Sequence, residues 1–312
     1  MRVSQFHGGH ANLTYCVSFE NQELVVRRQP FGNIAPGAHD MKREHRALSE
    51  LNPVFDRAPR VFAFCEDESV IGAPFIVMER RAGVVVRAEI PTELKAHANV
   101  EERVSLALVD AMAEFHAIDP VAAGLEKLGR PEGFVERQLS GWYKRWQLVT
   151  DEPDEIFESV FQALKVGQPT TLRNTLVHND LKLDNCMFDL ANPDRATTIL
   201  DWDMTTIGDP LIELGTLLSY WREPNDATDR APTIDLDMSA FPSRSALVDR
   251  YASSGADVTN INWYEAFGLW KQAVVLKQLF HRYDKGESHD ERMAAFPEFI
   301  PGQLQAALDI LS

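Results

Sequence analysis

The stretch His178-Asn179-Asp180-Leu181-Lys182-Leu183-Asp184-Asn185 predicts the fold, together with Ile199-Leu200-Asp201-Trp202-Asp203, which follows it closely. Short β-rich segments at 175–177, 186–189 and 197–200 surround these polar residues. Gly208-Asp209-Pro210 then opens a helix. A polar turn would explain the first stretch alone, because Asp, Asn and Lys are common in turns. The coincidence of all these features in order favours a functional site.

Three residues of the first stretch carry groups that phosphoryl transfer requires. Asp180 and Asn185 stand in His-x-Asp-x-x-x-x-Asn, the spacing of a kinase catalytic loop. Asp180 is therefore the candidate base that orients or deprotonates an accepting hydroxyl. Lys182 is expected to reach the γ-phosphate and neutralise its developing charge. His178 is expected to brace the loop through hydrogen bonds.

Oxygen ligands for Mg²⁺ come from both stretches. The Asn185 amide offers a carbonyl oxygen, and Asp201 follows a strand directly, which is where a chelating carboxylate is needed. Asp203 lies two residues beyond Asp201 and is predicted to point towards the same metal ions. The sequence thus predicts a magnesium site built from Asn185, Asp201 and Asp203.

The rest of the chain divides into a strand-rich first part and a helical second part. This predicts an α+β fold with two lobes, residues 1–80 forming a small sheet with one helix and residues 81–312 holding the catalytic loop, the metal site and the acceptor pocket. A ligand cleft is expected between the lobes. The predicted strands of the first lobe are 3–6, 13–19, 23–28, 61–65 and 75–78, with a helix at 39–51. Helices of the second lobe are predicted at 100–118, 131–149, 154–166, 211–221, 243–253, 262–283 and 301–311.

The quoted stretches, with Ile207-Gly208-Asp209-Pro210, resemble the aminoglycoside phosphotransferase and choline kinase superfamily. The fuller run to Trp221 resembles the subgroup associated with acyl-CoA dehydrogenase-like proteins. The resemblance implies a protein-kinase-like fold that uses ATP and Mg²⁺, with Asp180 catalytic and with Asn185 and Asp201 as metal ligands. It also implies that Asp209 pins the catalytic loop through hydrogen bonds, although capping the following helix is a second role open to it.

The N-terminal part departs from the kinase pattern. Gly8 and Gly9 form a thin glycine turn that lets the backbone approach phosphates, although a plain hairpin turn is about equally consistent with them. Arg27 stands where a strand Lys is usual, and it can grip a phosphate through two donors. Glu44, on the predicted helix, is its candidate partner, with a solvated helix face as the alternative.

These departures keep a second function open, a nucleotide-binding pseudokinase that acts as a regulatory module. Met78-Glu79-Arg80 is the predicted hinge whose backbone contacts adenine. The acceptor implied by the subgroup is a hydroxyacyl compound or its CoA thioester, ahead of an aminoglycoside or amino alcohol. The aromatic residues of 262–283 are expected to pack in the core.

Composition and motifs argue against several classes of protein. The net charge of −16 argues against nucleic-acid binding, which needs a basic face. There is no signal peptide and no apolar run long enough to span a membrane, and three scattered cysteines predict a cytoplasmic protein with reduced thiols. A protein kinase is disfavoured because Gly208-Asp209-Pro210 follows Asp201 too soon for a peptide-docking segment. The sequence leaves the acceptor and the oligomeric state open.

Overall fold

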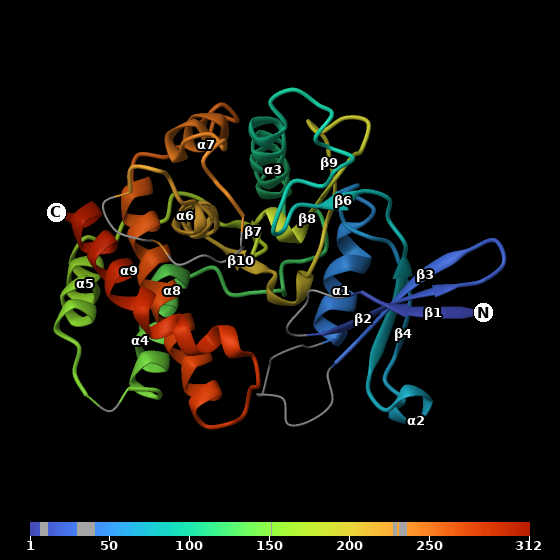
Figure 1. The fold of residues 1–312 in the computed structure, drawn as a ribbon, viewed down its shortest axis with the longest axis horizontal. Helices are drawn as coiled ribbons and strands as arrows, with labels where there is room; N and C mark the ends of the chain where they lie inside the picture. Colours follow the sequence, from blue (N-terminus) through green and yellow to red (C-terminus); the bar gives the residue numbers. More distant parts are fainter. Residues whose placement is uncertain (7–11, 30–40, 151, 227–229, 231–235) are drawn as a thin grey trace.

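The computed structural model describes residues 1–6, 12–29, 41–150, 152–226, 230 and 236–312. A five-stranded antiparallel sheet occupies the N-terminal part, in the order β1-β2-β3-β5-β4. Figure 1 shows this sheet on one side of a larger helical region. Its strands are β1 (Arg2–Gln5), β2 (Leu13–Ser18), β3 (Glu23–Arg28), β4 (Val61–Cys65) and β5 (Phe75–Glu79).

The central strand β3 positions one of the predicted site residues. Successive side chains of a strand point to opposite faces, so Val25 and Arg27 share one face and Arg28 lies on the other. The register pairs Val25 with Met78 of β5 and Arg27 with Thr14 of β2. Arg28 is buried on the opposite face, where its guanidinium donates to the Ile71 carbonyl at 2.6 Å. The alternation thus directs Arg27 alone towards the helical region.

Helix α1 (Met41–Leu51) lies against the sheet and completes the N-terminal part, which also contains the short helix α2 (Glu68–Ile71). Its buried residues recur at helical spacing and are mainly apolar. They are Met41, Glu44, Ala47, Leu48 and Leu51. Glu44 is the one charged member of this buried face, so it requires a partner inside the protein.

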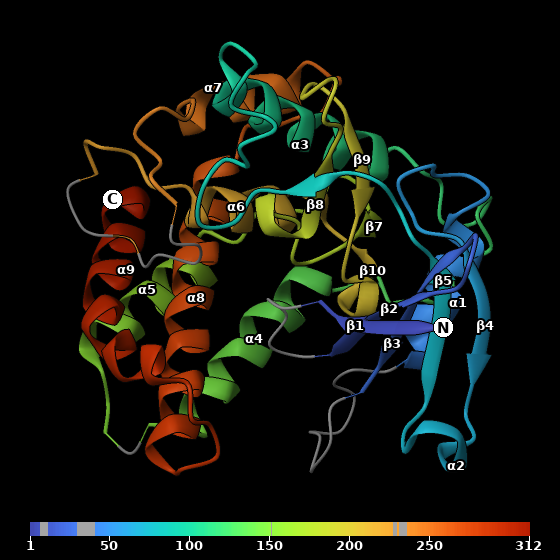
Figure 2. The same cartoon turned by 45° about the vertical axis from the view of Figure 1, so that its right-hand side comes forward.

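The C-terminal part is mainly helical. Figure 2 shows α8 and α9 side by side at the end of the molecule far from the N-terminal sheet. The helices are α3 (Val100–His116), α4 (Phe134–Gln147), α5 (Glu155–Val166), α6 (Pro210–Tyr220), α7 (Arg244–Ala252), α8 (Ile261–Asp284) and α9 (Phe296–Leu311). The aromatic residues of α8 are core residues as predicted, since Trp263, Tyr264 and Trp270 are buried.

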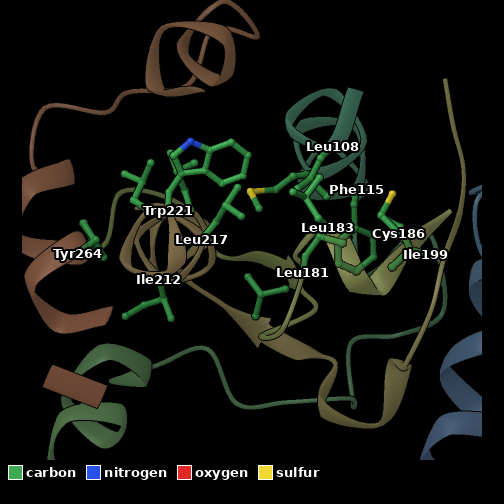
Figure 3. Packing of buried hydrophobic residues seen from close by; sticks show 14 of the residues in the cluster. Leu108, Phe115, Leu181, Leu183, Cys186, Ile199, Ile212, Leu217, Trp221 and Tyr264 are labelled. Atoms are coloured by element: carbon green, nitrogen blue, oxygen red, sulfur yellow. The ribbon is translucent and has the colours of Figure 1, made fainter. Parts of the chain in front are cut away.

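The loop 178–185 connects two small sheets. β7 (Thr175–Val177) pairs with β10 (Thr206–Gly208), and β8 (Cys186–Phe188) lies between β6 (Val84–Val85) and β9 (Ala196–Ile199). Leu181 and Leu183 are buried in the cluster that α3 and α6 border, as Figure 3 shows. These two leucines therefore anchor the polar loop from beneath.

Helices α6 and α8 approach closely because each carries a glycine at the contact. A Cβ on Gly215 would lie 2.3 Å from the Tyr264 backbone, and one on Gly268 would lie 2.7 Å from the Gly215 carbonyl oxygen. Neither distance is possible between real atoms. The two glycines thus set the spacing between α6, which begins beside the polar loop, and α8.

Most predicted elements are present, with shifts at some ends. The helix predicted at 131–149 begins only at Phe134, because Gly133 adopts a left-handed conformation with φ of 64° that interrupts the backbone there. Helix α9 begins at Phe296, five residues before the predicted start, and contains Pro301 in its interior. The short strands β6 and β10 were not predicted, since two or three residues carry no periodicity. Among the described residues, no helix is long and apolar enough to cross a membrane.

Candidate active site

The loop 178–185 leaves β7 and returns into β8, with Leu181 and Leu183 buried and Asp180, Lys182 and Asp184 half-buried. Asn179 has a left-handed backbone with φ of 69°, a conformation that Asn tolerates better than most residues. Its side-chain amide donates to the Met204 carbonyl at 2.9 Å. The loop is therefore tied to the segment that follows Asp201.

Asp180 is held by the two residues predicted to act with it. The Asn185 amide donates to Asp180 Oδ2 at 2.8 Å, and Lys182 Nζ lies 3.2 Å from the same oxygen. Burial alone would lower the pKa of Lys182, but the carboxylates of Asp180 and Asp184 outweigh it and raise that pKa, so the ammonium stays charged. Asp180 Oδ1 makes no hydrogen bond to any described residue, and it is free to accept one from an alcohol.

His178 is buried and braces the loop, as predicted from the sequence. Its Nε2 lies 2.8 Å from the Leu200 carbonyl oxygen, which can only accept, so Nε2 carries the proton. Its Nδ1 accepts from the Asp180 backbone N–H at 3.3 Å, and its ring packs edge-on against Trp202. His178 therefore links the start of the loop to the strand end that precedes Asp201.

Arg27 joins the two parts of the molecule. Its Nε lies 3.1 Å from Glu44 Oε2, and its Nη2 is ion-paired to Asp201 Oδ1. Burial of Arg27 opposes its charge, but Glu44 and Asp201 outweigh that effect and raise its pKa. Burial raises the pKa of Glu44 to about 7, and Arg27 acts in the opposite direction. A surface position for Arg27 and a solvated position for Glu44 are both excluded by this geometry.

A first cavity of about 400 Å³ lies beside this ion-paired group, between the sheet and the loop. The predicted hinge residues Met78, Glu79 and Arg80 line it, together with Val25, Arg27, Glu44, Asp184, Asn185 and Asp201. Gly8 and Gly9 lie outside the described residues. Asn12, which was not predicted as a site residue, also lines this cavity, and its buried amide has no hydrogen-bond partner among the described residues. An unsatisfied buried amide facing a cavity is suited to a polar ligand.

The residues at the inner end of the first cavity suit a magnesium ion. The amide nitrogen of Asn185 donates to Asp180, so the amide oxygen of Asn185 is available to a metal ion. Asp201 contributes a carboxylate. Asp184 adds a buried Oδ1 that has no hydrogen-bond partner in the described chain. Across the described ranges, no three His, Cys, Asp or Glu side chains gather into a metal cluster. Mg²⁺ is commonly bound in proteins by one or two carboxylates plus substrate phosphates, and Asn185 and Asp201 supply oxygen donors of the kind it takes.

The comparisons with known proteins agree with this geometry. A model of the phosphotransferase enzyme family matches residues 2–246. The chain belongs to that family. Acyl-CoA dehydrogenase family member 10 of Mus musculus is 28% identical over 294 residues, which are 92% of this chain and only 27% of that protein.

Two solved structures share the protein-kinase-like fold, which confirms the predicted fold class. One, from Ralstonia eutropha and provisionally named as an aminoglycoside phosphotransferase, has a TM-score of 0.80 and 26% identity over 99% of this chain and 92% of its own. The other is an aminoglycoside phosphotransferase in complex with AMP-PNP and hygromycin B. Its TM-score is 0.62 at 15% identity, over 99% of this chain and 93% of its own.

The loop of this phosphotransferase is pinned by a residue that the sequence did not single out. Within the described chain, Asp209 caps α6 by accepting from Leu211 N at 3.0 Å and accepts from the Tyr264 hydroxyl at 2.6 Å. Glu213 instead accepts from the His178 backbone N–H at 2.9 Å. The same Glu213 oxygen lies 2.8 Å from His116 Nε2. The capping role of Asp209 is present, and the expected contact with the loop comes from Glu213.

A sequence signal for Glu213 did exist, since it is a single acid in the otherwise apolar turn Leu211-Ile212-Glu213-Leu214. Burial opposes its charge, but the contacts with His116 and His178 outweigh this and hold the pKa of Glu213 below its ordinary value. A buried carboxylate kept ionised by two histidines requires each of them to stay in place.

A second cavity, of about 410 Å³, opens on the other side of the 201–204 turn. Asp203 lines this cavity, whereas Asp201 lines the first one. Asn179, Met204 and Thr206 form its border with the loop, and α4 and α8 supply the far wall. Two neighbouring residues of α1 also line different cavities, since Glu44 lines the first cavity and Arg43 lines the second. The two cavities thus meet at the Asp201–Asp203 turn.

Proposed function

We propose that this phosphotransferase is an active small-molecule kinase that transfers the γ-phosphate of ATP to a hydroxyl group. The observation that carries the proposal is the Asp180 carboxylate, whose Oδ2 accepts from the Asn185 amide at 2.8 Å and lies 3.2 Å from Lys182 Nζ. This arrangement brings a candidate base and a cation to one place, as phosphoryl transfer requires.

In the proposed reaction, Asp180 accepts the proton of the acceptor hydroxyl through its open Oδ1. The acceptor oxygen forms a bond to the γ-phosphorus while the bond between that phosphorus and the β–γ bridging oxygen breaks, which releases ADP. Lys182, charged and 3.2 Å from Asp180, offsets negative charge on the transferring group. Asn185 holds Asp180 in place through its amide.

ATP is proposed to occupy the first cavity, with adenine near Met78, Glu79 and Arg80. The Glu79 side chain accepts from the Arg60 backbone N–H at 2.6 Å and pairs with Arg81, and the Glu79 backbone N–H donates to the Arg60 carbonyl at 2.9 Å, so Glu79 is held in place at the cavity wall by these contacts. Gly8 and Gly9 are proposed to approach the phosphates, and Arg27 to contact them. Mg²⁺, held by Asn185 and Asp201 with Asp203 close by, would neutralise the phosphate oxygens. The AMP-PNP complex of the structural neighbour supports nucleotide use.

The acceptor is proposed to be a hydroxyacyl compound or its CoA thioester. The support is that the chain resembles a segment of proteins named acyl-CoA dehydrogenases, although it spans only about a quarter of the mouse protein. Aminoglycosides and amino alcohols are the less favoured acceptors.

A nucleotide-binding pseudokinase is the alternative, and one contact favours it. Arg27 occupies Asp201 Oδ1 directly, so Mg²⁺ has to share that carboxylate with a guanidinium. In an active enzyme the nucleotide phosphates would draw part of the Arg27 contact away from Asp201. In a pseudokinase the ion pair would persist and the nucleotide would bind without transfer.

Turnover by purified protein separates the two functions. The protein is incubated with Mg-ATP and single acceptors chosen from hydroxyacyl-CoAs, free hydroxy acids, choline and aminosugars, and both ADP and the phosphorylated acceptor are measured. We expect acceptor-dependent ADP release that Asp180→Asn lowers by roughly 10²–10⁴-fold, the range that a general base contributes.

The matched control is Asp284→Asn, the same change at an exposed position at the end of α8. It is expected to leave turnover unchanged. Nucleotide binding without transfer to any acceptor would favour the pseudokinase, and turnover that survives Asp180→Asn would show that the catalytic base is wrongly assigned.

A further inference from the structure

The second cavity has the opposite charge to the protein as a whole. The chain carries a net charge of −16. Five cationic side chains nevertheless line this one cavity, against the single carboxylate of Asp203. The cations are Arg43, Arg130, Arg137, Arg145 and Lys271. This local excess of positive charge attracts anions to the second cavity.

Most of these cations are not neutralised by the protein. Among the described residues, no carboxylate lies within ion-pair distance of Arg130, Arg137, Arg145 or Lys271, and the carboxylates of Asp180 and Glu213 act on Lys271 only from further away. Arg137 donates to the backbone carbonyls of Glu132 and Arg130, which orients it without cancelling its charge. The Arg145 guanidinium lies 4.2 Å from the centroid of the Trp142 ring. Arg137 and Arg145 are thus oriented by contacts that leave their charges available to a ligand.

Lys271 is the strongest of these observations because it is buried. Its exposed fraction is 7%, and its Nζ lies 5.5 Å from the centroid of the same Trp142 ring. An ammonium ion inside a protein is costly unless an anion accompanies it. Lys271 comes from the middle of α8, so the helix holds it rigidly in the cavity wall.

The position of the cavity relative to Asp180 assigns it to the acceptor. Asn179, one residue before Asp180, borders the second cavity, whereas Asp184 and Asn185 border the first. Asp180 itself lines neither cavity, but it lies on the loop between the residues that border each of them, and its carboxylate interacts with the charge of Lys271 in the wall of the second cavity. An acceptor in the second cavity would reach Asp180 from the side opposite the nucleotide, as in-line transfer requires.

We propose that the second cavity binds an anionic group of the acceptor, so that this phosphotransferase acts on alcohols that carry a phosphate or a carboxylate. The proposal rests on the function proposed above and narrows its acceptor to a chemical class. Lys271 and Arg145 are the specificity-determining residues. Cationic acceptors such as choline or aminosugars would place a positive charge among uncompensated cations, and this repulsion selects against them.

Binding of simple anions tests the site without requiring turnover. With Mg-AMP-PNP saturating the first cavity, calorimetric titrations with inorganic phosphate and with malonate are compared between wild type and variants. Both anions are expected to bind wild type. Lys271→Met and Arg145→Met should each weaken the binding at least tenfold, and Arg145 is exposed enough for its variant to fold. The control is Arg282→Gln on the exposed end of α8, which should bind as wild type does.

A substrate comparison completes the test. A hydroxy acid, its uncharged amide and choline are offered to the wild-type enzyme, and kcat/KM is expected to fall in that order. Tighter binding of phosphate than of malonate points to a phosphate ester as the acceptor, and the reverse points to a carboxylate. Equal anion binding in wild type and both cavity variants, or a preference for choline, would overturn the inference. Turnover that survives Asp180→Asn while anion binding persists would instead refute the proposed reaction and leave the anion site standing.

Discussion

Replacing Lys271 by Met is expected to stabilise the ligand-free protein while it damages anion binding. Burial lowers the pKa of Lys271 to about 8. The carboxylates of Asp180 and Glu213 act against this shift, and the charges of Lys182 and Arg145 add to it. Methionine has a similar length and no charge, so it can fill the same space without the cost of a buried ammonium.

The magnitude follows from the pKa. One pKa unit corresponds to about 1.4 kcal/mol, so the charged Lys271 costs the folded state on the order of 3 kcal/mol at pH 7. The variant also loses the contact between Lys271 and the Trp142 ring, which reduces its gain in stability by about 0.5–2 kcal/mol, the range for a cation over an aromatic ring. The net gain is about 1–3 kcal/mol, which is roughly 2–5 °C in Tm for a chain of this length.

The pH dependence has a definite sign. Between pH 8 and pH 10.5 the unfolded chain holds a proton on Lys271 that the folded chain has released. The free energy of unfolding of wild type therefore rises with pH across this window relative to that of Lys271→Met. The advantage of the variant is full below pH 8 and disappears by about pH 10.5.

Thermal unfolding of both proteins between pH 7 and pH 10.5, in buffer without phosphate or carboxylate, measures this difference. Lys285→Met, at an exposed position just after α8, is the control and should show a gap that does not vary with pH. A lower Tm for Lys271→Met at pH 7, or a constant gap across the window, would falsify the idea that Lys271 carries an uncompensated charge.

Three further changes address the other contacts of the site. Arg27→Met removes the partner of two carboxylates and should raise the KM for ATP at least tenfold, as measured by initial rates. Arg27→Lys keeps the positive charge and should restore part of the affinity for ATP. An unchanged KM would show that Arg27 does not contact the nucleotide. Glu213→Ala leaves His116 and the His178 N–H without their acceptor and should lower the free energy of unfolding by about 3–5 kcal/mol in urea titrations. Glu213→Gln should lower it by less. A loss below about 1 kcal/mol in Glu213→Ala would contradict the buried pairing. Gly215→Val should prevent α6 from packing on α8, and folded protein with native circular dichroism and wild-type Tm would show that the helices can separate at little cost.

The loop 178–185 was predictable as a candidate site because its pattern is local. His178, Asp180 and Asn185 lie within eight residues, and the spacing alone places their groups on one turn. Arg27 was predictable for a different reason, since strand alternation sends Arg27 and Arg28 to opposite faces whatever the rest of the fold is. Its partner Glu44 followed from the order of strand and helix, and the 3.1 Å contact bears this out.

Glu213 and the contacts of Asp209 were not predictable in the same way. Both residues belong to one helix start, and the sequence does not say which of two neighbouring acids turns towards the loop. The choice is made by packing, because Tyr264 of α8 takes one oxygen of Asp209 while His116 of α3 lies against Glu213. These partners are 55 and 97 residues away along the chain.

The sequence by itself determined the type of reaction site, the two-part α+β organisation and the residues of the loop, because each depends on short-range spacing or on periodicity. Only the tertiary structure decided what lies beyond Asp180. The cations of the second cavity come from α1, from the 130–145 region and from α8, and no local pattern joins them. Net charge is a sum over the whole chain, so −16 concealed a basic cavity that exists only where the fold brings these distant side chains together.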